Sequence, residues 1–273
     1  MHPEHTLNCS EVHNRHWRVF RCSMLLHESV EKPVSIYLEW TWSRDKGRAE
    51  SRTASMRKRL ALRLSMVIGN YGANTSSSTV EWALAELTRH PDVLKRAQLE
   101  RDSVVRDPAS LPLMQAVVKE TFRLHPPTPL SLPLMASEAC EVSGYSVPKG
   151  ATLLVNIWAI THDPASWPEP LEFRPARFLP GGRHESIDVK GKDFEIIPFG
   201  AGRRVCSGMS LGMRMVQPMA ATLAHGFDWR LPAGMRPENL DMEEAYGLKL
   251  QRAAPLMAYP VPRLVPAAYE GRC

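Results

Sequence analysis

The first clear pattern of apolar residues along the chain lies between residues 60 and 87, and it has helical spacing. Apolar positions within 60–68 and 80–87 follow a period near 3.6 residues, which predicts one long helix ending before His90 and Pro91. Gly72 and the hydroxyl residues of 75–79 lie in its middle. Glycine, and hydroxyls that bond to backbone carbonyls, weaken a regular helix. We therefore expect a loosened turn there.

Two further helices follow this one. Pro91–Val105 begins with proline, which is favoured at the first helical position. Leu113–Leu124 is amphipathic and carries Glu120 and Arg123 three residues apart, which places both side chains on one helical face. The pattern between residues 60 and 124 thus predicts helices.

A small β region and one more helix complete the pattern. Residues 141–157 alternate and contain turn residues, which predicts strands, one of them over Ala151–Ile157. The tail over 242–259 predicts a terminal hairpin. The run Gly208–Leu223 predicts a helix with a bend near Met215, because Pro218 falls in its interior. The fold class expected is mainly α with a small β region.

Residues 1 to about 55 differ from the rest, since they show neither clear alternation nor a sustained helical stripe. We divide the chain into an unassigned, irregular segment, 1–69, and a folded domain, 70–273. The basic run 44–59 is compatible with a binding module for nucleic acid or lipid headgroups. A solvated charged segment is the commoner explanation of such runs, and no nucleic-acid partner is expected.

Composition limits the class of protein without identifying it. The chain has 273 residues, 44% of them hydrophobic, which is enough to bury a substantial core as one or two domains. Its net charge is +5. Its five cysteines are scattered without CxxC spacing, which indicates neither a disulfide framework nor a zinc site. No stretch approaches the roughly 18 apolar residues of a membrane span, so no anchor is expected.

The chemistry concentrates in residues 194–208, around Cys206. Glycines at 200, 202 and 208 permit positive φ angles and close approach of backbone to a flat ligand. Cys206 stands just before a predicted helix, whose N-terminal N–H groups stabilise a thiolate. Arg203 and Arg204 are suited to pairing with carboxylates. A lone cysteine is more often a small buried hydrophobe, but this spacing favours a ligand.

The spacing of Phe199, Gly202, Arg204, Cys206 and Gly208 resembles the haem-ligand signature of the cytochrome P450 family. Over about residues 70–265, segments such as VKETFRLHPPTPLSLP and MEEAYGLKLQRAAPLM resemble the plant flavonoid 3'-monooxygenase group within that family. The resemblance implies the C-terminal half of the cytochrome P450 fold. Family members are about twice as long as this chain.

The resemblance also implies roles for particular residues around a haem b cofactor. Cys206 would be the axial ligand of the iron, and Thr75 and Asn74 would be the catalytic residues, as hydrogen-bond partners of the iron-bound oxygen. The remaining implied roles are cofactor binding by Phe199, Gly202, Arg204 and Gly208, a structural charge network of Glu120, Arg123 and Arg177, and substrate contact by Leu130, Leu132 and Leu248. Asn74, Leu134 and Ala176 depart from the family's usual acid, arginine and glutamate.

The implied activity is hydroxylation of a flavonoid-type aromatic substrate, with O2 and electrons from an NADPH-dependent reductase at the cytosolic face of the endoplasmic reticulum. Membrane association is implied by the family only. Two alternatives stay open: a catalytically inactive fragment or regulatory remnant, and the basic binding module of residues 44–59.

Overall fold

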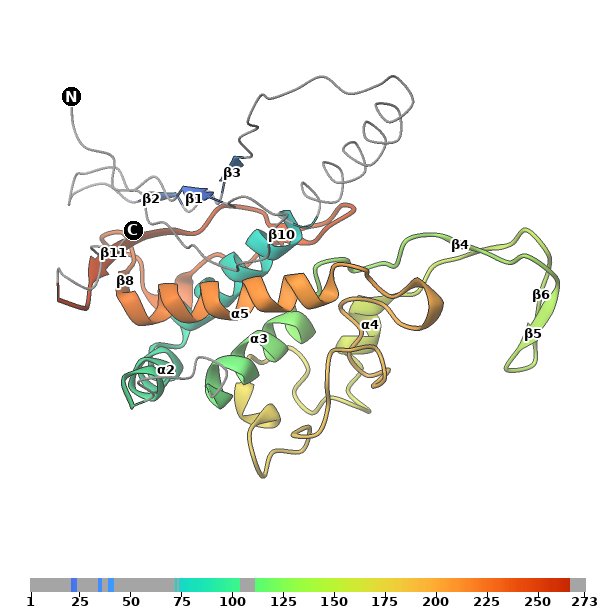
Figure 1. The fold of residues 1–273 in the computed structure, drawn as a ribbon, viewed down its shortest axis with the longest axis horizontal. Coiled ribbons are helices and arrows are strands. Elements are labelled where there is room, and N and C mark those ends of the chain that lie inside the picture. The colour runs from blue at the N-terminus through green and yellow to red at the C-terminus, as the bar shows by residue number, and fades with distance from the viewer. Residues whose placement is uncertain are drawn as a thin grey trace, which may run out of the picture.

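The computed structural model describes residues 72, 74–103 and 111–265, and the backbone of three short strands nearer the N-terminus. Helices and short 3-10 turns dominate the described part, with small sheets around them (Figure 1). The helices are residues 74–89, α2 Pro91–Ser103, α3 Pro112–Leu124, α4 Ile157–Thr161 and α5 Met209–Gly226. The 3-10 helices are η1 Pro175–Phe178, η2 Gly202–Arg204 and η3 Pro237–Asn239.

Helix α3 forms the centre of the core. Ten of its thirteen residues are buried, including Glu120 and Arg123 as well as the apolar ones. Its N-terminus is held by Glu100 of α2, whose carboxylate accepts the N–H groups of Leu113 and Met114 at 2.8 and 3.2 Å. A carboxylate is favourable there because the first N–H groups of a helix lack partners and carry partial positive charge. Helix α3 is therefore a fixed platform for what packs on it.

Helix α5 lies across α2 and α3 (Figure 1). Gln98 of α2 donates from its side-chain amide to the carbonyl of Ala224 at 3.1 Å, which ties α2 to the C-terminal end of α5. The apolar face of α5 is buried through Val216, Ala220 and Leu223. The loop before α5 is therefore held at the edge of a rigid three-helix layer.

The sheets are short and antiparallel. Strand β4 Leu134–Met135 pairs with β7 Thr152–Leu153, and β5 Cys140–Val142 pairs with β6 Tyr145–Val147. Strand β9 Glu244–Ala245 pairs with β10 Gln251–Arg252, and β8 Phe227–Arg230 pairs with β11 Met257–Pro262. The backbone strands are β1 Arg21–Ser23, which pairs with β3 Glu39–Thr41, and β2 Val34–Ser35, which pairs with β11.

Most predicted elements are present, and the mainly α class with a small β region is confirmed. The predicted strand over Ala151–Ile157 was too long. Only Thr152–Leu153 is a strand, and Ile157 already begins α4. The side chain of Asn156 accepts the N–H of Ala159 at 2.9 Å, so it caps a helix where a strand was expected.

The predicted terminal hairpin was partly wrong. Strands β9 and β10 form a hairpin, whereas β11 pairs with β8, which precedes both of them in the chain. Helix α5 contains Pro218 as expected but continues without a break through Met215 and Pro218. Pro218 and Arg214, whose carbonyl loses its helical partner, are both exposed, so the missing bond faces outward.

Candidate functional site

The loop that contains Cys206 is closed by backbone hydrogen bonds. The N–H of Cys206 donates to the carbonyl of Phe199 at 2.8 Å, and the N–H of Val205 donates to the carbonyl of Gly202 at 3.2 Å. Gly200 and Gly202 have φ angles of 71° and 64°, in the left-handed region where a Cβ is strained. The glycines therefore permit the path that brings Cys206 to the start of α5.

Phe199 anchors this loop to the helical layer. Its ring meets that of Phe122 in α3 edge to face, with centroids 5.3 Å apart. On the other side it lies over Gly212 of α5, where an added Cβ would lie 3.4 Å from the ring. Edge-to-face pairs of this kind add about 0.5–1.5 kcal/mol beyond area burial. Phe199 thus holds the loop from beneath while the ligand candidate stays on the surface.

The residues above Phe199 are open to solvent. Cys206 is exposed with a free thiol, and Gly202 and Arg204 are exposed beside it. Gly208, half-buried, is the cap of α5, and a Cβ there would lie 3.7 Å from the Cys206 sulfur. An accessible thiol beside an exposed guanidinium fits a prosthetic group that offers an electron-poor metal and carboxylates.

Thr75 and Asn74 lie in the first described turn of the helix of residues 74–89, where Gly72 is helical as well. The Thr75 hydroxyl donates to the carbonyl of Gly72 at 3.3 Å, and the Ser77 hydroxyl donates to the carbonyl of Asn74 at 3.0 Å. The Thr79 hydroxyl bonds in the same way to the carbonyl of Thr75. The hydroxyl run therefore does bond back to the backbone, as its composition indicates.

The three leucines expected to contact substrate are all exposed. Leu130, Leu132 and Leu248 have exposed fractions of 47%, 66% and 59% and are among several large apolar side chains that the described part of the chain leaves exposed. Leu130 pairs as a β-bridge with Asn156, so its backbone is fixed although its side chain is open. Leu248 lies at the tip of the β9–β10 hairpin. The structure thus provides apolar contact surface on fixed backbone.

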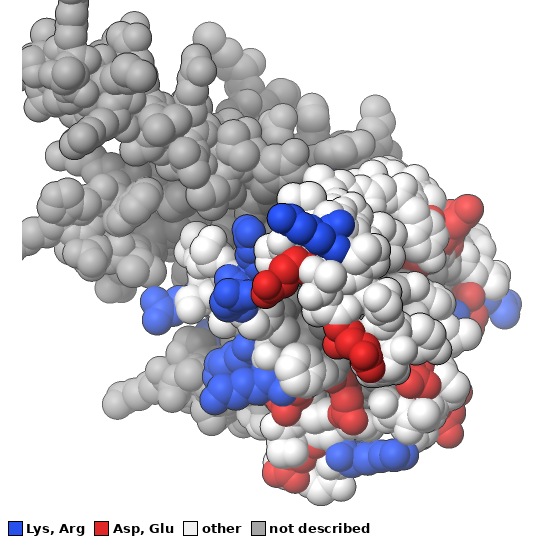
Figure 2. All heavy atoms as spheres, turned by 90° about the vertical axis from the view of Figure 1, so that its right-hand side faces the viewer, with Lys and Arg blue, Asp and Glu red and all other residues white. Residues whose placement is uncertain are grey.

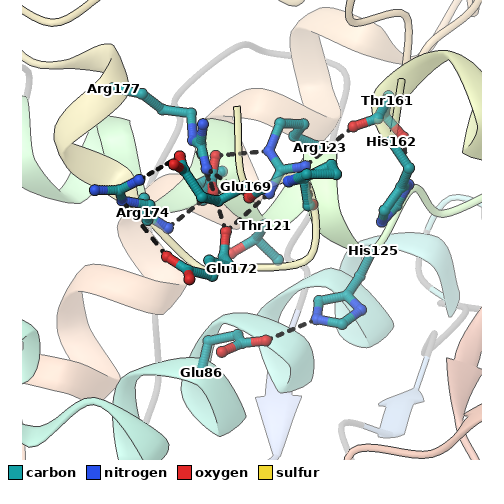
Figure 3. Close-up of polar contacts among 12 residues, drawn as sticks. Glu86, Thr121, Arg123, His125, Thr161, His162, Glu169, Glu172, Arg174 and Arg177 are labelled. Carbon is teal, nitrogen blue, oxygen red and sulfur yellow. Dashed lines mark hydrogen bonds and ion pairs between the residues drawn. The ribbon is translucent and has the colours of Figure 1, made fainter. Parts of the chain in front are cut away.

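Glu120 and Arg123 of α3 and Arg177 of η1 are brought together in one network of ion pairs (Figure 3). Arg123 donates from Nε and Nη2 to the two oxygens of Glu120, both at 2.9 Å. Arg177 in η1 donates from Nε to Glu120 Oε1 at 3.2 Å. The backbone N–H of Arg174 adds a fourth bond to this carboxylate at 2.9 Å. Glu120 is thereby fully satisfied although its side chain has no exposed surface.

The remaining donors of the two arginines reach backbone carbonyls of the proline-rich loop 161–172. Arg123 Nη1 donates to Thr161 at 3.0 Å and to Pro170 at 2.7 Å, and Arg177 Nη1 donates to Pro168 at 2.9 Å. Burial lowers the pKa of Arg177, and the neighbouring Glu120 opposes that shift. The network therefore joins α3, the loop and η1 into one unit.

A second buried polar cluster, around His125, was not predicted from the sequence. Its two ring nitrogens lie 2.9 Å from Glu86 Oε1 and 2.8 Å from Glu244 Oε1. The ring also stacks on Trp82, with centroids 3.7 Å apart. Its partners are 39 and 119 residues away, so no local spacing could have pointed to it.

Residues 44–256 match the family model of cytochrome P450. The chain belongs to the cytochrome P450 family. It is 65% identical over 206 residues to a flavonoid 3'-monooxygenase of Oryza sativa subsp. japonica, covering 72% of this chain and 39% of that protein. It is 58% identical over 207 residues to a flavonoid 3',5'-hydroxylase of Crocosmia x crocosmiiflora, covering 73% and 39%. The chain thus spans about two fifths of the length of the curated relatives it matches.

A solved zebrafish cytochrome P450, whose structure contains progesterone, is 33% identical and superposes with a TM-score of 0.62. The match covers 73% of this chain and 44% of the zebrafish chain. The cytochrome P450 fold of this part of the chain is therefore supported by sequence and by structure. Membership of this family implies a haem-iron cofactor.

Three expectations fall wholly or partly beyond the described residues. The basic run 44–59 and the first part of the long helix, residues 60–71, lie outside them. Of the segment 1–69, only strands β1, β2 and β3 are described. Among described residues, no helix is long and apolar enough to cross a bilayer, and no three histidine, cysteine or acidic side chains gather as a metal site.

Proposed function

We propose that this chain is the haem-thiolate part of a monooxygenase that hydroxylates the B-ring of a flavonoid, with haem b as its cofactor. The observation that carries the proposal is the exposed, free Cys206 thiol on a glycine-permitted turn at the start of α5. The 65% identity to a flavonoid 3'-monooxygenase supports the substrate class. The 58% identity to a 3',5'-hydroxylase leaves the number of hydroxyls added open.

Each residue of the loop has one task in this proposal. A haem bound through a thiolate supplies oxygen activation, because the thiolate donates electron density that favours O–O cleavage. Cys206 would hold the haem iron through its thiolate, and Arg204 would pair with a haem carboxylate. Gly202 and Gly208 keep side chains away from the ring, and Phe199 supports the loop against α3 and α5. Glu120, Arg123 and Arg177 fix the platform below.

Proton handling is assigned to Thr75 and Asn74. The Thr75 hydroxyl can both donate and accept hydrogen bonds, and it must rotate away from the Gly72 carbonyl to face a ligand. The Asn74 amide can donate and accept but cannot release a proton near neutral pH. In this proposal the Thr75 hydroxyl therefore relays the proton, while the Asn74 amide contributes only hydrogen bonds.

Leu130, Leu132 and Leu248 are proposed to contact the flat aromatic body of the substrate. Their exposed apolar area matches a ligand that is apolar on its faces, and burying each side chain contributes roughly 1.5–3 kcal/mol. In this proposal an NADPH-dependent reductase supplies the electrons, at the cytosolic face of the endoplasmic reticulum. Nucleic acid has no part in the proposal, and on the face drawn in Figure 2 the Lys and Arg side chains stand among Asp and Glu side chains.

Turnover tests the proposal directly. The chain loaded with haem is mixed with a plant NADPH-dependent reductase, NADPH, O2 and a flavonoid with one B-ring hydroxyl. We expect a product with one further B-ring hydroxyl, and none from Cys206→Ser. Stoichiometric haem without any hydroxylated flavonoid would contradict the proposed activity. Failure to retain haem would favour the alternative of an inactive remnant.

A further inference from the structure

His125 is surrounded by charged groups on both of its ring nitrogens. It caps the C-terminus of α3, and its side chain is buried against Trp82 of the helix of residues 74–89. Nε2 lies 2.9 Å from Glu86 of that helix, and Nδ1 lies 2.8 Å from Glu244 of β9. Figure 3 shows the contact with Glu86, at a distance from the arginine network. One ring therefore bridges three elements.

This geometry requires protons on both ring nitrogens. Ionised carboxylates only accept hydrogen bonds, and a neutral imidazole has a single N–H. Burial lowers the pKa of His125, but the bonds to Glu244 and Glu86 outweigh it and the net shift is upward. Burial raises the pKa of Glu86, but the bonds from His125 and His90 bring it down to about 2. The cluster is thus an imidazolium between two carboxylates.

The cluster continues to the tip of the β9–β10 hairpin. The other oxygen of Glu244 accepts the hydroxyl of Tyr246 at 2.8 Å, and Tyr246 is exposed two residues before Leu248. A hydrogen-bonded chain thus runs from Glu86 through His125 and Glu244 to Tyr246. Its inner end is fully buried and its outer end is at the surface.

The far strand of the hairpin is held by separate contacts. The N–H of Leu250 donates to the carbonyl of Pro127 at 2.9 Å, and the Ser78 hydroxyl donates to the carbonyl of Leu250 at 3.0 Å. The guanidinium of Arg252 lies over the Trp82 ring, 5.2 Å from its centroid. The near strand, β9, is tied to the helices by the side chain of Glu244, while Arg252 bonds to the carbonyl of Asp241 and to the sulfur of Met242 just before it. The residues that lead into β9 are thus held from β10, and Glu244 adds the link from β9 itself to the helices.

We propose that His125 is a positioning residue: through Glu244 and Tyr246 it sets the orientation of the β9–β10 tip, and hence of Leu248, against a bound aromatic substrate. The inference rests on the proposed function in one respect, that the tip contacts substrate. It assigns His125 no contact with substrate or cofactor. It also makes the tip sensitive to proton binding at a buried site.

Hydrogen exchange of the 273-residue chain without haem tests the positioning step. In Glu244→Ala, His125 keeps its bond to Glu86, so no buried carboxylate is stranded, while β9 loses its link. We expect amide exchange over residues 244–252 to rise on the order of ten- to a hundredfold, with α3 unchanged. The matched control is Glu243→Ala, which removes the exposed carboxylate of the residue just before β9. Unchanged exchange over 244–252, or an equal rise in α3, would overturn the inference.

The protonation of the ring gives an independent spectroscopic readout. At pH 7 an ordinary histidine is mostly neutral. Nitrogen chemical shifts of an imidazolium with two N–H protons are expected for His125 and, among the buried histidines of the described part of the chain, for no other. His184 is the control, because burial lowers the pKa of its ring. A neutral His125 ring at pH 7 would overturn the inference.

The pH dependence has a defined sign. Because the pKa of folded His125 is raised, protection of the hairpin is complete below about 6.5, the ordinary histidine value, and is lost as pH rises through the folded pKa. The charged groups that face this ring or its partners are Glu86, His90, Arg123, His162, Glu244 and Arg252. Protection of residues 244–252 that is constant from pH 6 to pH 10 would contradict the inference.

The substrate step is tested with Tyr246→Phe, which removes only the outer hydroxyl of the chain. In the haem-loaded chain with reductase we expect a several-fold rise in KM for the flavonoid with kcat retained. Tyr145→Phe, equally exposed on the β5–β6 hairpin, should leave KM unchanged. Unchanged KM in Tyr246→Phe would overturn the substrate step. Absence of flavonoid turnover in the unaltered chain would instead refute the proposed function, while the exchange and pH results stand on their own.

Discussion

The two regions on either side of Phe199 differ in almost every physical respect. Beneath it, Glu120 and Arg123 have no exposed side-chain surface, and their charges are matched by hydrogen bonds at 2.9 Å. Above it, the segment 202–207 is exposed throughout, including Cys206. The charges of the lower region are paired within the described residues, whereas the upper region presents solvent-exposed side chains that can bind a ligand.

This difference separates stability from chemistry. A buried charge network loses several kcal/mol when one member is removed, because the remaining charge is left without compensation. An exposed loop residue can be replaced with little effect on folding but with full effect on a ligand that it binds. Substitutions in the two regions should therefore have opposite signatures.

The largest effect is expected at Cys206. Cys206→Ser should abolish the reduced carbon monoxide difference band typical of thiolate ligation. The free energy of unfolding should change by no more than about 0.5 kcal/mol, because the side chain is exposed. Cys140→Ser, the other exposed free thiol in the described part of the chain, should leave the band unchanged. A thiolate band that persists in Cys206→Ser would disprove the ligand assignment.

The opposite signature is expected at Glu120. Glu120→Ala leaves Arg123 and Arg177 buried without their carboxylate and should reduce the free energy of unfolding by about 3–5 kcal/mol. Urea unfolding followed by far-ultraviolet circular dichroism measures it. Glu169→Ala removes the exposed partner of Arg174 and should cost about 0–1 kcal/mol. Equal losses in the two variants would show that the network is no stronger than a surface pair.

Acid should weaken the molecule through Glu86 rather than through the loop. Its pKa is lowered to about 2 by His125 and His90 against the opposing effect of burial. Its stabilisation is therefore complete above about 4.5 and is lost as pH falls toward 2, on the order of 3 kcal/mol in all. Unfolding measured between pH 5 and pH 2.5 should show this slope, and Glu86→Gln should flatten it. An equal slope in Glu86→Gln would assign the acid sensitivity to other carboxylates.

The same contrast explains which parts of the site could be predicted. The glycine spacing around Cys206 is local, and the left-handed φ angles of Gly200 and Gly202 agree with it. The pair Glu120 and Arg123 is also local, since a helix places such residues on one face. Arg177 came from the family resemblance. These residues are encoded within short windows or by likeness to known proteins.

What could not be predicted depends on contacts distant in sequence. The environment of His125 is set by Glu86 and Glu244, and β11 pairs with β8 across the intervening β9–β10 hairpin. The overlong strand at 151–157 is a different failure, because Asn156 is a favourable helix cap and offered a local signal. The run Thr152–Val155 before it matches a strand equally well, and periodicity alone does not separate the two.

Pro218 gives the smallest of the expected effects and tests the exposed side of α5. The helix runs unbroken through it, with Pro218 and Arg214 both exposed, so the lost hydrogen bond is solvated rather than buried. Pro218→Ala restores the N–H and should stabilise the chain by about 1–3 kcal/mol. The upper limit is the full difference in helix propensity between proline and alanine, about 3 kcal/mol. Thr222→Ala, one turn later on the exposed face, should gain no more than about 0.7 kcal/mol. If Pro218→Ala is destabilising in urea unfolding, α5 depends on a shape that only the proline maintains. That result would support the bend expected near Met215.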